Sequence, residues 1–116
     1  MIELDVWVRG TLQAQTRAIH SLPENTGDWT DSDVRTLLTE MLLSLEREKN
    51  PDGERPDVTL RGFSWIVSPY ETTGVLVHLE MQMGTVSAGP LAIDEPRLTA
   101  MVARVMASSN PPQRVH

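Results

Sequence analysis

The 116-residue sequence contains no cysteine, and this absence removes several kinds of chemistry at once. A disulfide framework, a zinc–thiolate site, an iron–sulfur cluster and a cysteine nucleophile all require thiol side chains. Thiol redox chemistry is excluded for the same reason.

Long apolar runs and an excess of positive charge are missing as well. No stretch approaches the roughly 18 apolar residues of a membrane-spanning helix. The first residues include Glu3 and Asp5, where a secretory signal has basic residues. The formal net charge is −6, and a field of that sign repels phosphate backbones and anionic lipids. We therefore expect a cytoplasmic protein that binds neither nucleic acid nor membranes.

The net negative charge of the chain arises in its first half. Residues 1–57 hold six basic and twelve acidic side chains, whereas residues 58–116 hold four of each. Such acidity is typical of proteins that stay in solution, and it also favours a basic partner over an acidic one.

The familiar reaction motifs are absent too. The chain has no G-x-S-x-G, H-E-x-x-H or G-x-G-x-x-G sequence. Gly84 and Gly89 have the spacing of a phosphate-binding loop, but Pro90 and Leu91 follow where lysine and a hydroxyl residue are needed. We assign no catalytic residue, no metal and no cofactor, and the sequence favours a non-enzymatic protein without deciding the question.

Alternating apolar and polar residues predict two strands, at residues 2–9 and 75–83. Residues 11–22 fit either a strand or a short helix, and we favour a strand. From residue 31 the apolar residues recur with helical spacing. The helix is expected to begin after Thr30, with Asp33 completing a form of the capping box, and to end before Pro51.

The second half of the chain repeats this change of pattern. Residues 58–68 favour a strand, but their apolar residues change face, which a bulge at Gly62 reconciles. Residues 84–89 are expected to form a link or a short edge strand. A closing helix is predicted to begin after Asp94, whose side chain suits the N-cap.

These elements predict an α+β fold. One-sided strands and two one-sided helices indicate a two-layer sandwich, with an antiparallel sheet of three or four strands and both helices on one face. The approximate order is ββαββα. Residues 1–108 are predicted to form a single α+β domain, and residues 109–116 a flexible C-terminal tail.

Two helices leave the other face of the sheet uncovered. Strand alternation places on that face the five interface candidates Trp7, Leu76, His78, Glu80 and Gln82. A large aromatic anchor among polar groups is typical of a protein interface. We therefore predict a binding or adaptor protein that acts as a homodimer or with a protein partner, with Trp7 near the centre of the contact.

Two alternatives remain open at this point. His78 and Glu80 lie two residues apart on one strand face, where a carboxylate can orient a general base or share a metal with a third ligand such as Glu3 or Asp5. That arrangement would make a small enzyme or a ligand- or metal-binding domain. The other alternative is a structural subunit of a larger assembly.

Overall fold

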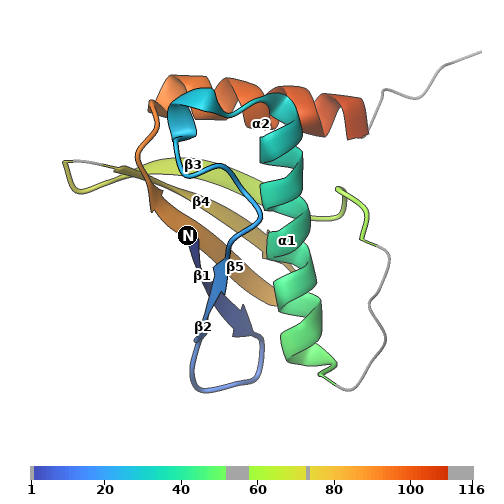
Figure 1. Ribbon diagram of the computed structural model, residues 1–116. Coiled ribbons are helices and arrows are strands. Elements are labelled where there is room, and N and C mark those ends of the chain that lie inside the picture. The colour runs from blue at the N-terminus through green and yellow to red at the C-terminus, as the bar shows by residue number, and fades with distance from the viewer. Residues whose placement is uncertain (1, 52–57, 73, 110–116) are drawn as a thin grey trace, which may run out of the picture.

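The chain folds as an α+β structure in the computed structural model, which describes residues 2–51, 58–72 and 74–109 (Figure 1). The elements are β1 (Ile2–Val8), β2 (Gln15–Ile19), a short 3-10 helix η1 (Thr26–Asp28), α1 (Asp31–Lys49), β3 (Ser64–Tyr70), β4 (Gly74–Met81), β5 (Gly84–Leu91) and α2 (Glu95–Ser109). Five antiparallel strands form one sheet in the order β2-β1-β5-β4-β3. The predicted fold class is confirmed, with five strands in place of three or four.

β5 accounts for the difference in strand number. The prediction of a link or short edge strand at residues 84–89 is wrong, because β5 lies in the middle of the sheet, between β1 and β4. Glycine usually weakens a strand interior unless another backbone comes close. A Cβ on Gly84 would lie 2.0 Å from the Trp7 carbonyl oxygen, and one on Gly89 would lie 2.7 Å from the Val75 carbonyl oxygen. These glycines therefore admit neighbouring strands and do not end β5.

The bulge predicted at Gly62 is also wrong. β3 begins at Ser64, and Gly62 lies in the preceding loop with a φ of +80°. Leu60 is buried and Val58 and Phe63 pack against the core, so the change of apolar parity marks a loop that enters the core before the strand starts. β3 then continues through Pro69, which is tolerated because β3 is an edge strand.

Both helices begin where the sequence predicts. Thr30 and Asp33 form a reciprocal capping box at the start of α1. The predicted apolar stripe of α1 is buried: Val34, Leu37, Leu38, Met41, Leu42 and Leu45. The Asp94 carboxylate accepts a hydrogen bond from the Arg97 backbone N–H, at 3.1 Å, at the start of α2.

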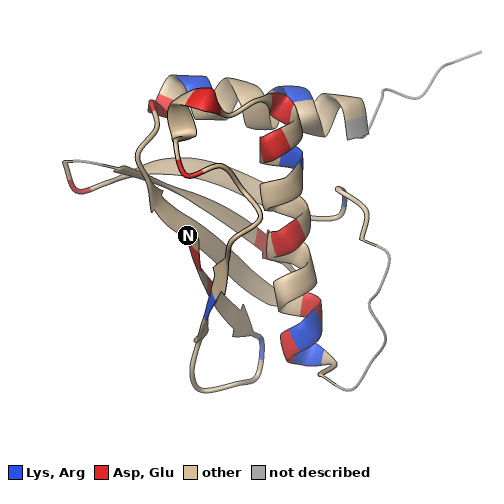
Figure 2. Cartoon of the chain, in the orientation of Figure 1, with Lys and Arg blue, Asp and Glu red and all other residues tan. Residues whose placement is uncertain are grey.

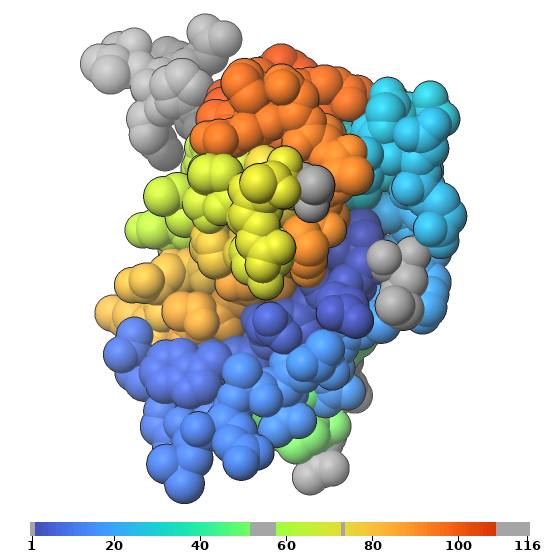
Figure 3. All heavy atoms as spheres, turned by 90° about the vertical axis from the view of Figure 1, so that its left-hand side faces the viewer, coloured from blue at the N-terminus to red at the C-terminus, as the bar shows by residue number. Residues whose placement is uncertain are grey.

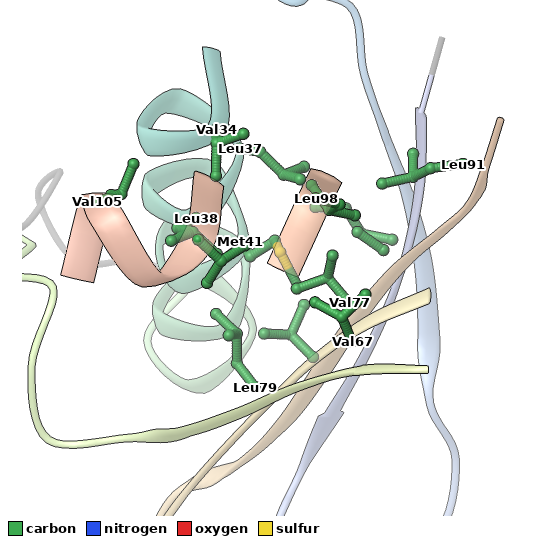
Figure 4. Packing of buried hydrophobic residues seen from close by; sticks show 14 of the residues in the cluster. Val34, Leu37, Leu38, Met41, Val67, Val77, Leu79, Leu91, Leu98 and Val105 are labelled. Carbon is green, nitrogen blue, oxygen red and sulfur yellow. The ribbon is translucent and has the colours of Figure 1, made fainter. Parts of the chain in front are cut away.

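The core lies between the sheet and the two helices (Figure 4). Side chains from α1, α2 and the central strands meet there, among them Met41, Leu98 and Leu79. Burial of this apolar surface is the main source of stability in a domain of this size. Around the core, Arg17 of β2 pairs with Glu48 of α1, which places that side of β2 toward the helices.

Polar contacts fix α2 to the segment that leads into α1. The Arg97 guanidinium donates to the carbonyl oxygens of Thr26, Gly27 and Trp29 at 3.1, 3.2 and 3.0 Å. Arg104 donates to both carboxylate oxygens of Asp31 at 2.8 and 2.9 Å. The hydrogen bond from this guanidinium is the main reason that the pKa of Asp31 lies below its ordinary value.

In the described part of the chain, no helix is long and apolar enough to cross a membrane. The tail predicted at residues 109–116 lies outside the described residues, except for Ser109, the last residue of α2.

Burial of the α1 stripe predicts that replacing a leucine of the stripe by alanine lowers the free energy of unfolding far more than the same replacement at an exposed leucine. Leu38 is fully buried, so Leu38→Ala is expected to lower the free energy of unfolding by about 2–4 kcal/mol. Leu12 is 100% exposed, so Leu12→Ala should change it by less than about 0.5 kcal/mol. Urea denaturation followed by circular dichroism measures both values. Equal losses would contradict the burial of the stripe.

The close approach of β1 and β5 predicts that Gly84→Ala is more damaging than Gly62→Ala. A methyl group at Gly84 meets the Trp7 carbonyl, whereas at Gly62 it meets nothing within 4 Å. Gly62→Ala should therefore cost only the backbone strain of a positive φ, about 1–2 kcal/mol. Chemical denaturation of the two variants gives the comparison. A Gly84→Ala protein as stable as Gly62→Ala would show that the two strands are further apart.

The lowered pKa of Asp31 predicts a pH-dependent effect of Arg104→Gln. A carboxylate with a depressed folded-state pKa stabilises the fold above its ordinary pKa, and this stabilisation is lost as the pH falls through the lowered value. Arg104→Gln should therefore lower Tm at about pH 7, and its Tm should approach that of the wild type near about pH 2. Arg47→Gln, on the exposed surface of α1, is the matched control. If the difference in Tm between the wild type and Arg104→Gln stays constant with pH, Arg104 is not the cause of the lowered pKa of Asp31.

Candidate functional site

One face of the sheet is not covered by any helix in the described part of the chain. α1 packs on β1 and β5 and α2 packs on β3, all from the same side. Figure 3 shows the opposite side, where the strands themselves form the surface. We call this surface the open face. Its outward side chains are Glu3, Asp5, Trp7, Thr16, Ala18, Ser64, Ile66, Ser68, Tyr70, Leu76, His78, Glu80, Thr85 and Ser87.

His78 lies near the middle of the open face, held by a hydroxyl from each neighbouring strand. Its Nε2 is 3.1 Å from the Ser68 Oγ on β3, and its Nδ1 is 2.8 Å from the Ser87 Oγ on β5. In neutral histidine one ring nitrogen donates and the other accepts, so one serine accepts a hydrogen bond and the other donates. Both ring nitrogens of His78 are therefore occupied.

Glu80 does not take part in this group. It belongs to the next row across the sheet, paired in register with Ser64 and Thr85, and its side chain is exposed. No hydrogen bond joins Glu80 to His78 among the described residues. The two residues share a face, as predicted, but the serines orient the imidazole and the carboxylate does not.

The proposed third metal ligands are also separated from His78. β5 lies between β1 and β4, so Asp5 and His78 are two strands apart, about 10 Å at the usual strand spacing. Asp5 instead accepts a hydrogen bond from the Thr16 hydroxyl at 3.2 Å. Within the described ranges, no group of three histidine or acidic residues is placed to hold a metal ion.

The serine–histidine contacts resemble part of a nucleophilic site, but the surrounding backbone does not complete one. Acyl transfer needs free donors where the oxyanion develops. β4 and β5 are each paired on both sides, so their N–H groups are used in the ladder around His78. The paired N–H groups of β4 and β5 beside Ser68, His78 and Ser87 are therefore not free to form an oxyanion hole.

Trp7 lies at a corner of the open face and not at its centre. Its indole N–H donates to the Thr11 carbonyl oxygen at 3.1 Å, and the Arg9 guanidinium carbon lies 5.8 Å from the ring centroid. The ring is thus packed within the β1–β2 hairpin. Leu76 is two strands and two rows away, roughly 16 Å from Trp7 by standard strand geometry.

Gln82 completes the set of predicted interface residues, but it lies beyond the end of β4. It occupies the exposed β4–β5 turn, and its backbone carbonyl accepts a hydrogen bond from the Arg9 Nε at 2.8 Å. Trp7 and Gln82 are therefore both near Arg9, at one end of the sheet. His78, Leu76 and Glu80 lie along β4.

The most exposed large apolar residues of the open face were not among the predicted interface residues. Ile66 is 58% and Tyr70 is 42% exposed, both on β3, and Leu76 lies beside them because it pairs with Ser68 between the two. We call Ile66, Tyr70 and Leu76 the β3/β4 patch. Ile66 has the parity opposite to the inward residues of β3, which could have identified it. Tyr70 was missed because the predicted strand ended at residue 68, whereas β3 continues to Tyr70.

The carboxylates of the open face lie outside the β3/β4 patch. They belong to Glu3 and Asp5 on β1 and to Glu80 on β4, and no outward strand position of the described sheet holds a lysine or arginine. The face is therefore acidic toward β1 and apolar toward β3. No protein-family model, curated protein or solved structure matches the chain.

Proposed function

We propose that this chain is a non-enzymatic binding protein that acts as a homodimer, with the two subunits in contact through the β3/β4 patch. The observation that supports this proposal is the exposure of Ile66 and Tyr70 beside Leu76, on a sheet face that no described helix covers. The cores of interfaces are more apolar than the surrounding surface and are enriched in aromatic residues such as tyrosine.

A second copy of the chain is the partner that the apolar β3/β4 patch favours, because the carboxylates of the open face lie outside this patch. Twofold pairing of identical surfaces is the commonest closed arrangement. With the twofold axis at the β3/β4 patch, the Glu3 and Asp5 carboxylates of each subunit lie at the periphery, away from their counterparts. β3 is an edge strand, so the patch reaches the rim of the sheet and is open to a partner.

The proposed contact is centred on Ile66, whereas the sequence predicted a contact centred on Trp7. Trp7 is half-buried and its N–H is already bonded within its own hairpin, so it offers less new apolar contact. His78 is adjacent to Ile66 in register and lies at the edge of the contact. The alternative of a small enzyme or metal-binding domain based on His78 and Glu80 receives no support from the hydrogen bonds of His78.

Sedimentation velocity over a range of protein concentrations tests the homodimer. We expect the wild type to dimerise and Ile66→Glu to raise the dissociation constant at least about thirtyfold, the effect of losing an interface anchor. Leu12→Glu is the matched control, because Leu12 is fully exposed but lies outside the open face. It should change the constant by less than about twofold.

The other outcomes of this experiment are equally informative. A wild type that stays monomeric at about 1 mM protein would overturn the homodimer. A dissociation constant of that size corresponds to only about 4 kcal/mol of binding free energy. A larger effect of Trp7→Ala than of Ile66→Glu would place the interface at the β1 corner. An equal effect of Ile66→Glu and Leu12→Glu would remove the β3/β4 patch from the contact.

A further inference from the structure

A cavity of about 270 Å³ lies at the end of the molecule where α1 finishes. The C-terminal half of α1, the segment at residues 58–61 and the end of β4 with its following turn form the walls. Its apolar lining comes from Leu42, Val58, Met81 and Met83, and its polar lining includes Glu46 and Arg61. It is on the helix side of the sheet, because Met81 has the inward parity of β4.

The apolar walls are suited to an apolar group of modest size. Val58, Met81 and Met83 pack against the core but remain partly exposed, so the cavity is where their surface meets solvent. Methionine side chains are flexible and polarisable, and they adapt to ligands of different shapes. The volume is close to the lower limit of small-molecule pockets, about 300 Å³. A short alkyl chain or a single ring is the group that such a space accommodates.

Among the described residues at the mouth of the cavity, the basic side chains outnumber the acidic one, Glu46. Arg61 and Lys49 line an adjoining hollow together, with Gly62 and Gln82 beside them. Neither side chain forms a hydrogen bond or an ion pair with the described residues. Figure 2 shows basic residues alternating with acidic ones at this end of α1.

Among the described residues that line the cavity, Glu46 is the acidic one, and a single carboxylate does not neutralise two cations. Glu46 accepts a hydrogen bond from the Asn50 side-chain amide at 2.9 Å, within its own helix. Lys49 is in the last turn of α1, where a cation also stabilises the helix dipole. Arg61 is in a loop and has no such role. A guanidinium that has no partner among the described residues, beside an apolar cavity, suits an anion, since its fork of donors matches a carboxylate.

We propose that this cavity binds a small amphipathic carboxylate. The apolar part of the ligand lies among Met81, Met83 and Leu42, and the carboxylate accepts hydrogen bonds from Arg61, with Lys49 adding a second positive charge. This binding is independent of the homodimer, because the cavity and the β3/β4 patch are on different sides of the sheet.

Methionine methyl NMR with sodium octanoate as the probe tests the proposal directly. With ¹³C-methyl methionine incorporated, the Met81 and Met83 signals should shift saturably, while that of Met101, which is buried on α2, should not. Octan-1-ol has the same chain without the charge, so it should bind about tenfold more weakly, the effect of losing one charge-assisted hydrogen bond.

Two arginine variants supply the matched comparison. Arg61→Gln should weaken octanoate binding about tenfold, whereas Arg47→Gln, at the same end of α1 but outside the cavity lining, should change it by less than about twofold. The proposal is overturned if octanoate causes no saturable shift at Met81 and Met83, or if Met101 shifts equally. Equal affinities for octanoate and octan-1-ol, or for the two arginine variants, would remove the anion site.

Discussion

β5 holds two hairpins together in a single sheet, and the positions of the other elements depend on that contact. β1 pairs with β2 and β4 pairs with β3, but neither hairpin bonds to the other except through β5. The contact is possible because Gly84 has no side chain where the β1 backbone passes. With the hairpins joined, one continuous face is available for both helices to cover. Both described helices pack on that face, so neither of them covers the opposite one.

The parts of the fold that could be predicted depend on local pattern. The stripe of α1 and its Thr30–Asp33 cap are encoded within about twenty neighbouring residues, and so is the alternation of β1 and β4. β5 was not predicted as a central strand because glycine and proline, here Gly89 and Pro90, ordinarily mark the end of a strand. Their tolerance here is decided by Val75, which is close in space and distant in sequence.

For the candidate surface, the sequence predicted the face on which each residue lies but not the distances between the residues. Parity correctly placed Trp7, Leu76 and His78 on one face, because it needs only the strand to which each belongs. Their mutual distances depend on strand order, which single-strand patterns do not contain. The order inserts β5 between His78 and Asp5, and it gives His78 the two serines as partners in place of a carboxylate. One strand, β4, also serves two surfaces, since Glu80 faces the open side and Met81 lines the cavity.

The pairing of β1 with β5 also has a consequence for how the chain reaches its folded state on the ribosome. The paired residues, such as Leu4 and Ala88, are about 80 positions apart in the sequence. The N-terminal hairpin therefore leaves the ribosome long before its central partner is synthesised. A two-stranded hairpin is at best marginally stable in water by itself. The nascent hairpin gains its central strand partner only when β5 emerges, although α1, which packs on the apolar face of β1, is synthesised earlier. The last third of the chain therefore completes the sheet that the first third begins.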